Sequence, residues 1–226
     1  MANQAQNPKS KNKITQFILD VLFPSFCVDC GKEGTFLCDD CRAKIVVKRV
    51  PQKPDSKSAL SKIYAATDYN QRSVTGLITG LKFHSIADMK YPLTEILIHH
   101  LSLVNFQPLK NCVIMPVPLH KRREIKRGFN QAGLIAEEIA EFFKTPYCED
   151  VLKRTKNTEP QTETLNHNQR LENIKNAFAC RKPELVAGKR IIIVDDVMTT
   201  GATLNECARA LKSAGARSIT AFAVAN

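Results

Sequence analysis

The sequence contains no tryptophan, and aromatic residues make up only 7% of its 226 residues. Proteins that stack single-stranded nucleic acid usually do so on aromatic rings, so a row of stacking platforms is not expected here. Long apolar runs are also missing. The most apolar early stretch, residues 14–26, contains Asp20, is too short to cross a bilayer and has no small-residue cleavage site. We therefore expect neither a transmembrane span nor a signal peptide, and we expect a cytoplasmic protein.

Acidic residues are scarce relative to basic ones. The chain has 22 Asp and Glu against 33 Lys and Arg, which gives a formal net charge of +11. Such a surplus favours polyanionic partners, including nucleic acid, phosphosugars and anionic lipid headgroups. Two nucleotide- or DNA-binding patterns are absent. The lack of G-x-x-x-x-G-K-[ST] argues against an ordinary ATPase site, and no helix-turn-helix pattern supports a regulator of duplex DNA.

The chain from residue 63 onward predicts an α/β fold. Short β-rich runs alternate there with helical periods, which is typical of a mainly parallel central sheet flanked by helices. The expected strands are 63–66, 112–117, 147–152, 177–180, 190–194 and 218–224, and the expected helices are 72–83, 92–104, 131–143 and 203–213. The predicted organisation is a disordered tail (1–13), a helix with a small cysteine module (14–45), a basic linker (46–62) and the α/β domain (63–226).

The most informative segment reads I-I-I-V-D-D-V-M-T-T-G-A-T, from Ile191 to Thr203. An unbroken β-branched run that ends in two acids indicates a central parallel strand, and ligands bind at the carboxyl ends of such strands. The turn that follows offers backbone N–H groups, threonine hydroxyls, a glycine able to adopt positive φ and a helix N-terminus. These are the parts of a phosphate cradle.

Asp195 and Asp196 come directly before this cradle. Two carboxylates would repel the phosphate itself, so we expect them to accept hydrogen bonds from sugar hydroxyls or to face Mg²⁺. A phosphorylated sugar would satisfy both halves of the segment. The alternative is that the acids only cap the strand and that the Thr/Gly stretch is a helix N-cap.

This segment resembles the motif with which type I phosphoribosyltransferases bind 5-phosphoribosyl 1-pyrophosphate (PRPP). The resemblance implies that Asp195 and Asp196 bind the ribose hydroxyls. It also implies that the 5-phosphate is held by Met198, Thr199, Thr200, Gly201, Ala202 and Thr203. Mg²⁺ is then expected with PRPP, and the reaction class is pentosyl transfer with release of pyrophosphate.

Further segments resemble one narrower family. They are Leu81-Lys82-Phe83, the basic stretch Pro116 to Arg127 with the following Gly128-Phe129-Asn130-Gln131-Ala132, and a polar stretch around Arg154 to Arg170. With the cysteine pairs described next, they resemble the ComF family of competence-associated, phosphoribosyltransferase-like proteins. The resemblance implies that Lys121 to Arg127 face pyrophosphate, with Arg127 favoured, and that residues 154–170 form a flexible lid. A solvated basic loop is the alternative for any single cation.

Four cysteines are spaced as two C-x-x-C pairs, Cys27 with Cys30 and Cys38 with Cys41. Four thiolates at this spacing can close a tetrahedral structural Zn²⁺ site, and metal binding could supply most of the folding energy of the segment. A redox role is the alternative, although no thioredoxin-like context surrounds the pairs. The remaining four cysteines are expected to be small core residues, and no histidine is assigned a catalytic role.

Two functions from different classes follow from these observations. The first is a phosphoribosyltransferase whose acceptor cannot be identified from the sequence. The second is a non-catalytic protein that uses PRPP as a ligand while its basic surface and cysteine module bind single-stranded DNA or competence partners. The link to DNA uptake is an implication of the ComF resemblance, and the positive charge agrees with it because Lys and Arg contacts to phosphates release counterions.

Overall fold

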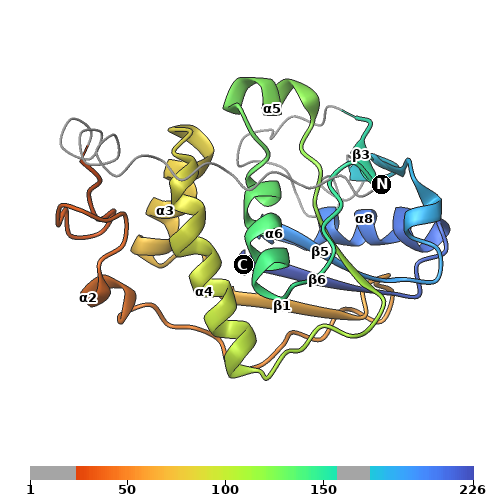
Figure 1. Cartoon of the computed structure of the whole chain (residues 1–226), viewed down its shortest axis with the longest axis horizontal. Helices are drawn as coiled ribbons and strands as arrows, with labels where there is room; N and C mark the ends of the chain where they lie inside the picture. Colours follow the sequence, from red (N-terminus) through yellow and green to blue (C-terminus); the bar gives the residue numbers. More distant parts are fainter. Residues whose placement is uncertain (1–23, 157–173) are drawn as a thin grey trace, which may run out of the picture.

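A computed structural model describes residues 24–156 and 174–226 (Figure 1). The predicted tail (1–13), the predicted amino-terminal helix (14–22) and residues 157–170 of the predicted lid lie outside the described residues.

The centre of the described chain is a four-stranded parallel sheet. Its strands are β1 (Lys62–Thr67), β2 (Cys112–Pro116), β5 (Arg190–Val197) and β6 (Ser218–Ala225), and they lie in the order β1-β6-β5-β2. Every neighbouring pair is parallel. All four carboxyl ends therefore meet at one edge of the sheet, which is the edge that binds ligands in open α/β folds.

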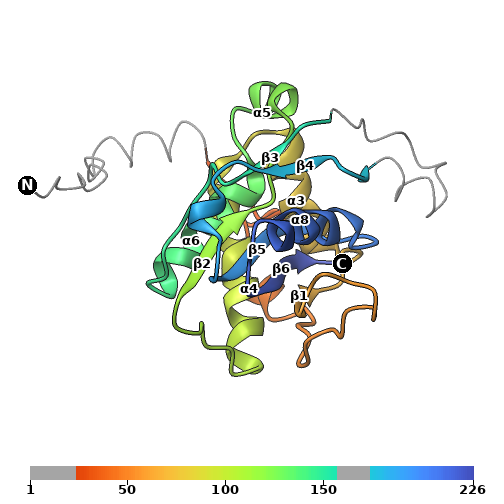
Figure 2. The ribbon, with the colours of Figure 1, turned by 90° about the vertical axis from the view of Figure 1, so that its right-hand side faces the viewer.

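Side chains alternate between the two faces of the sheet, and each face carries its own apolar core. The larger helical layer consists of α3 (Arg72–Phe83), α4 (Lys90–Leu103) and α6 (Gln131–Phe142). The opposite face is covered by α8 (Ala202–Ser213), which buries Leu204, Cys207, Ala208 and Leu211 (Figure 2). Strand β5 serves both cores, since Ile192 and Val194 face one and Ile191 and Ile193 face the other.

Smaller elements complete the fold. These are α2 (Asp39–Arg42), η1 (Ala87–Met89), α5 (Lys121–Arg127), η2 (Pro183–Leu185) and an antiparallel hairpin of β3 (Leu152–Arg154) and β4 (Phe178–Cys180). The hairpin packs on α8, on the side opposite α4 and α6 (Figure 2).

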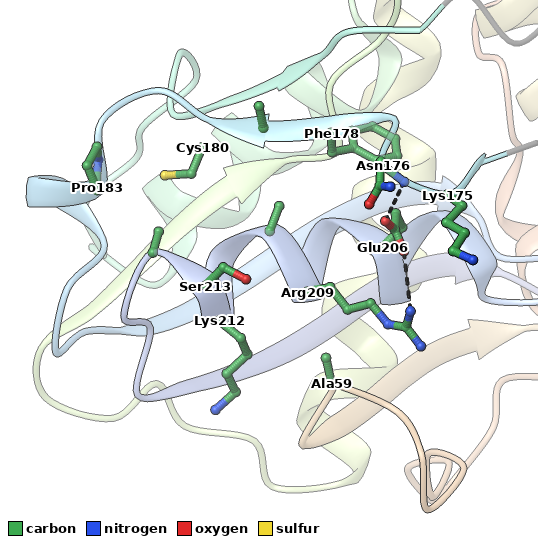
Figure 3. A pocket seen from close by; sticks show the side chains of 13 residues that line it. Ala59, Lys175, Asn176, Phe178, Cys180, Pro183, Glu206, Arg209, Lys212 and Ser213 are labelled. Atoms are coloured by element: carbon green, nitrogen blue, oxygen red, sulfur yellow. Dashed lines mark hydrogen bonds and ion pairs between the residues drawn. The ribbon is translucent and has the colours of Figure 1, made fainter.

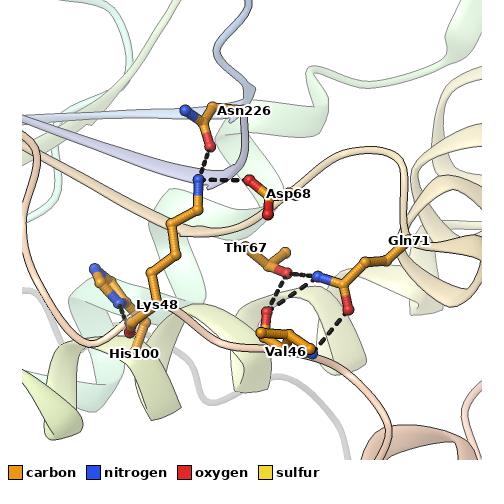
Figure 4. A network of polar contacts seen from close by, with 7 residues as sticks. All are labelled: Val46, Lys48, Thr67, Asp68, Gln71, His100 and Asn226. Carbon is orange, nitrogen blue, oxygen red and sulfur yellow. Dashed lines mark hydrogen bonds and ion pairs between the residues drawn. The ribbon is translucent and has the colours of Figure 1, made fainter.

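The chain that precedes β1 lies against the sheet edge. Val47 and Gln52 form isolated antiparallel bridges with Thr67 and Ile63. The Thr67 hydroxyl donates to the carbonyl oxygen of Val46 at 2.7 Å, in the polar network shown in Figure 4. These contacts belong to the segment expected to be a basic linker; the division into domains stays a prediction.

Three sequence-based expectations differ from the structure. Of the expected strand 147–152, Tyr147 forms one bridge to Ile114 of β2, and Leu152 begins β3, which pairs with β4 and not with the central sheet. Helix α5 occupies the basic stretch expected to be a loop, where His120 caps it by accepting from the Arg122 N–H. Strand β5 extends past Val194 because β6 continues to pair with it, and its last three residues thus include both acids.

Candidate functional site

The two acids of β5 lie at the ligand-binding edge of the sheet. Asp196 is 6% exposed and Asp195 is partly buried. Their carboxylates accept hydrogen bonds from the next backbone N–H in each case, Asp195 from Asp196 at 2.9 Å and Asp196 from Val197 at 2.7 Å. The second oxygen of Asp196 lies 3.0 Å from the ammonium group of Lys82, a residue in the last turn of α3. Backbone hydrogen bonds thus hold both acids in place, and one partly buried cation pairs with Asp196.

The electrostatics of this pair depend on burial and on each other. Burial raises the pKa of Asp195, the adjacent Asp196 carboxylate raises it further, and Lys82 opposes both effects. Removing Lys82 would leave two neighbouring carboxylates in a poorly solvated position without their nearest cation. The pair is therefore suited to a partner that brings hydrogen-bond donors or positive charge.

The turn after β5 leads directly into the N-terminus of α8. Gly201 has φ of +74° and is the N-cap residue of the helix, a conformation that suits glycine because it has no Cβ. The N-cap glycine has no side chain to cap the helix, and the exposed Thr200 hydroxyl accepts only a long hydrogen bond of 3.4 Å from the Ala202 N–H. Unpaired N–H groups and the helix dipole both favour an anion at such a position.

A cavity of about 310 Å³ joins these parts. Its lining residues are Lys82, Phe83, Val117, Pro118, Leu119, Arg123, Arg127, Asn130, Gln131, Ala132, Arg154, Asp195, Asp196 and Thr203. Four cations thus face two acids. The Arg127 guanidinium lies 5.7 Å from the centre of the Phe83 ring and donates to the Gln131 side-chain oxygen at 2.9 Å. Burial lowers the pKa of Arg127 and Asp196 opposes that shift. A ligand that carries several negative charges fits this lining.

The structure brings some of the predicted site residues together and separates others. Asp195, Asp196, Thr203 and Arg127 line the same cavity. Met198 is 7% exposed and packs into the core below the turn, while Thr199, Thr200, Gly201 and Ala202 form the turn without lining the cavity. Lys121 lines a neighbouring cavity of about 510 Å³, which shares Pro118, Leu119, Asn130 and Arg154 with the first.

Lys82 and Gln131 are polar residues of the cavity to which no role was assigned from the sequence. Lys82 lies at the end of an amphipathic helix, where a lysine usually only complements the helix dipole. Gln131 opens α6, directly after the cationic stretch. Both residues lie in segments that carry the family resemblance, Leu81-Lys82-Phe83 and Gly128-Phe129-Asn130-Gln131-Ala132. The sequence of these segments does not indicate which side chains point into the cavity.

A wider cavity of about 780 Å³ lies between the outer face of α8 and the segment that contains β4 (Figure 3). Lys175, Arg209 and Lys212 are among its lining residues, and Glu206 accepts from the Asn176 N–H at 2.7 Å. None of the acids or threonines of the phosphate turn lines it. Its size alone does not make it the candidate site, because the chemistry predicted from the sequence lies at the carboxyl ends of the strands.

The four cysteines of the amino-terminal module form a compact cluster. The sulfur atoms of Cys27, Cys30, Cys38 and Cys41 all lie within 4.8 Å of one another, and all four are free thiols. A tetrahedral zinc–thiolate site with Zn–S bonds near 2.3 Å places its sulfurs about 3.8 Å apart. The Cys30 and Cys38 sulfurs lie 3.6 Å apart. The cluster could therefore hold one zinc ion with a closed set of four ligands.

The surroundings of the cluster favour thiolate at one position. Burial alone would raise the pKa of Cys27, but N–H groups of Cys30, Cys38 and Asp29 point at it and lower the pKa to about 6. Burial raises the pKa of Cys41, with further contributions from the neighbouring thiols. The pKa values of Cys27 and Cys41 are thus shifted in opposite directions. A bound cation would favour the thiolate at all four positions.

The module packs directly on α3. Asp29 accepts a hydrogen bond from the Ser73 hydroxyl at 2.7 Å and pairs with Arg72 at 3.3 Å. Val28 lies against Gly76, where an added Cβ would come within 2.9 Å of the Val28 Cβ. The first turns of α3 thus contact the cysteine module, and its last turn places Lys82 in the cavity.

No helix within residues 24–156 and 174–226 combines the length and the apolar character that a membrane span needs. Two solved structures match part of this chain at low similarity. One is the glutamine PRPP amidotransferase from B. subtilis, at 17% identity and a TM-score of 0.40, covering 69% of this chain and 28% of that chain. Another, an allosteric regulatory enzyme of purine biosynthesis, matches at 18% identity and a TM-score of 0.40, covering 62% of this chain and 26% of that one.

Sequence comparisons give the family. Residues 125–226 match the phosphoribosyl transferase domain. The DNA utilization protein YhgH of Escherichia coli O6:H1 is 30% identical over 203 residues, which cover 86% of each chain. Competence protein F of Haemophilus influenzae is 39% identical over 114 residues, and the match spans 50% of this chain and 49% of that protein. Competence protein ComFC of Bacillus subtilis is 36% identical over 116 residues, 51% of this chain and 45% of that protein. The chain belongs to the ComF family, whose members carry a phosphoribosyltransferase domain.

Proposed function

We propose that this protein binds PRPP together with Mg²⁺ in the cavity at the end of β5 and transfers its phosphoribosyl group to an acceptor. The bond between the anomeric carbon and a pyrophosphate oxygen breaks while the nucleophile of the acceptor bonds to that carbon, and pyrophosphate leaves with the electron pair. The observation that carries this proposal is the convergence of Asp195 and Asp196, Lys82, Arg127 and the N-terminus of α8 on one cavity.

Each part of the site has a separate task. Asp195 and Asp196 accept hydrogen bonds from the ribose hydroxyls. The turn from Met198 to Thr203 holds the 5-phosphate with its backbone N–H groups and hydroxyls. Mg²⁺ would neutralise the leaving pyrophosphate. Lys121 and Arg127 lie on α5, and Arg127 is the one that reaches the cavity. The transfer is expected to take place in the cytoplasm.

The first test is calorimetric titration of PRPP with Mg²⁺ into the zinc-loaded protein and into the Asp195→Asn/Asp196→Asn double variant. Saturable binding is expected for the unaltered protein. The variant should bind at least about a hundredfold more weakly, because two hydrogen bonds to charged acceptors are replaced by weaker ones. Absence of binding to the folded protein would contradict the proposal.

A second function is favoured by the basic surface and by the relatives. Helix α5 buries none of its residues and exposes Lys121, Arg122 and Lys126. The chain carries a net charge of +11, and one relative is named a DNA utilization protein. We propose that α5 contributes to a nonspecific interface with single-stranded DNA, through backbone phosphates rather than stacked bases. Competence proteins that handle incoming DNA are then candidate partners.

Fluorescence anisotropy with an oligothymidylate over a range of salt concentrations tests this interface. The triple variant Lys121→Gln/Arg122→Gln/Lys126→Gln should bind more weakly and show a shallower salt dependence, with a slope reduced by about one for each phosphate that the variant no longer neutralises. The matched control removes the same charge from exposed lysines elsewhere, as Lys53→Gln/Lys57→Gln/Lys110→Gln. Equal weakening in both variants would mean that α5 is not a specific contact surface.

A further inference from the structure

The last residue of α3, Phe83, is a large apolar side chain that the fold leaves open. It is 71% exposed, whereas the apolar face of the same helix is buried and consists of Val74, Leu77, Ile78 and Leu81. Exposed apolar residues are common on protein surfaces and by themselves need no special role. Phe83 is different from the others in the described part of the chain, because it alone among the exposed large apolar side chains lines the candidate cavity.

Two cations border this ring. Lys82, the preceding residue, lies 3.0 Å from an oxygen of Asp196 inside the cavity. The Arg127 guanidinium, at the end of α5, lies 5.7 Å from the centre of the Phe83 ring, where the face of an aromatic ring attracts a cation. Phe83 is 71% exposed with this contact in place, so Arg127 does not cover it. The ring is therefore a flat, open apolar surface at the point where α5 meets the cavity.

The charge beside the ring indicates which kind of partner can use it. Helix α5 has five cations among its seven residues, and Lys121, Arg122 and Lys126 are exposed. A partner that lies on this helix must be an anion, and one that also covers Phe83 must carry a flat apolar group. Acidic peptides and lipid headgroups supply the charge without such a group, and duplex DNA keeps its base faces stacked inside. Single-stranded DNA supplies both, because its phosphates come with unpaired bases that stack on aromatic side chains.

We propose that Phe83 stacks one base of the single-stranded DNA whose phosphates lie on α5. This proposal rests on the proposed DNA interface and extends it from α5 to the rim of the PRPP cavity. Helix α5 contacts phosphates, and Phe83 of α3 provides the contact to a base. The low aromatic content of the chain agrees with a single stacking position beside the cavity rather than a row of them.

Fluorescence anisotropy with two probes of equal charge tests this position. One probe is an oligothymidylate, and the other is an abasic oligomer with the same number of phosphates. The unaltered protein should bind the oligothymidylate at least about fivefold more tightly, because stacking one base on an aromatic side chain strengthens binding by about that factor or more. Phe83→Leu keeps an apolar side chain but removes the ring. It should lose most of this preference by weakening oligothymidylate binding, while its affinity for the abasic oligomer stays the same.

The salt dependence of binding separates stacking from charge. The slope of log affinity against log salt concentration reports the number of phosphates that the protein neutralises, and Phe83 carries no charge. Phe83→Leu should therefore keep the slope of the unaltered protein, in contrast to the triple variant of α5. Phe83→Tyr retains a ring and should retain the preference for oligothymidylate. The matched control is Phe142→Leu, because Phe142 is 54% exposed at the end of α6 and does not line the cavity.

The outcomes distinguish the stacking position from the interface on which it rests. If the unaltered protein binds both probes equally well, or if Phe83→Leu keeps the preference for oligothymidylate, Phe83 is not a stacking position and the contact through α5 stands. A loss of preference in Phe142→Leu as large as in Phe83→Leu would also overturn the assignment to Phe83. Thymidine that competes as strongly as the oligothymidylate would assign the ring to a small heterocyclic ligand instead of DNA. If the unaltered protein binds neither oligomer, the DNA interface itself fails.

Discussion

At the scale of single residues, His100 makes stability depend on pH. The side chain is fully buried, its Nδ1 donates to the Lys48 carbonyl at 2.7 Å, and Nε2 has no partner among the described residues (Figure 4). Burial lowers the pKa of His100; the hydrogen bond to the Lys48 carbonyl opposes this shift, and the charges of Lys48 and His99 add to it. Above the unfolded-state pKa of about 6.5 both states are neutral. As the pH falls below that value only the unfolded chain gains the proton, so the free energy of unfolding should decrease by up to about 1.4 kcal/mol per pH unit.

Urea denaturation between pH 5 and pH 8 measures this dependence. His100→Asn keeps a donor for the Lys48 carbonyl but cannot titrate, and its stability should change less between pH 7 and pH 5. His99→Asn is the matched control, because the neighbouring His99 is exposed. If the pH dependence is the same in His100→Asn and in the unaltered protein, His100 is not its source.

The sequence predicted the backbone around the cavity well and the placement of side chains poorly. The run ending in Asp195 and Asp196 predicted a strand, a turn and a helix, because β-branched residues and glycine act through local conformation, and the structure contains all three; that the turn binds an anion stays a prediction. Lys82 and Gln131 could not be assigned in this way. Whether a lysine at the end of α3 reaches β5, or a glutamine turns inward at the start of α6, depends on packing between elements far apart in the chain.

At the scale of elements, α3 joins the cysteine module to the cavity, and Gly76 sets how closely the two parts approach. An alanine within a helix normally stabilises it by about 1 kcal/mol relative to glycine. At Gly76 the added Cβ would meet Val28 at 2.9 Å, so the module would have to shift. Gly76→Ala should therefore lower the free energy of unfolding by about 1–3 kcal/mol, as measured by thermal or urea denaturation.

Gly133→Ala, in α6, is the matched control for this change. The nearest atom to its added Cβ is the terminal oxygen of Glu149 at 3.1 Å, which belongs to a flexible side chain that can move away. Its stability should stay the same or rise slightly. If Gly76→Ala is as stable as Gly133→Ala, the contact between Val28 and α3 contributes little to the docking of the module.

The helices themselves were readable from the sequence. Apolar spacing predicted α3 at its observed limits, and it predicted α4, α6 and α8 to within two residues. Helix α5 was missed because it has no buried residue, and so its sequence shows no apolar period. The expected strand at 147–152 is interrupted: Tyr147 bridges Ile114 of β2, but the pairing with the central sheet stops there, and Leu152 begins β3, which pairs with β4.

At the scale of the whole molecule, the cysteine module shares a core with the helices on one face of the sheet. Cys27, Cys38 and Cys41 belong to the same buried apolar cluster as Leu77 and Leu81 of α3. If the cluster holds zinc, metal binding stabilises this shared core and not only the module. A chelator should then lower the melting temperature of the whole chain, and the loss of helical signal should remain one cooperative transition rather than becoming two.

Cys30 allows metal binding to be separated from packing, because it is the exposed member of the four. Cys30→Ser removes one ligand and almost no buried surface, so it should lower the melting temperature of the metal-loaded protein but not that of the chelated protein. Cys180→Ser, a partly buried cysteine outside the cluster, should shift both by the same amount. A melting temperature that Cys30→Ser leaves unchanged in the metal-loaded protein would mean that the four thiols do not act as a zinc site. A second, separate transition in the chelated protein would mean that the module and the sheet fold independently.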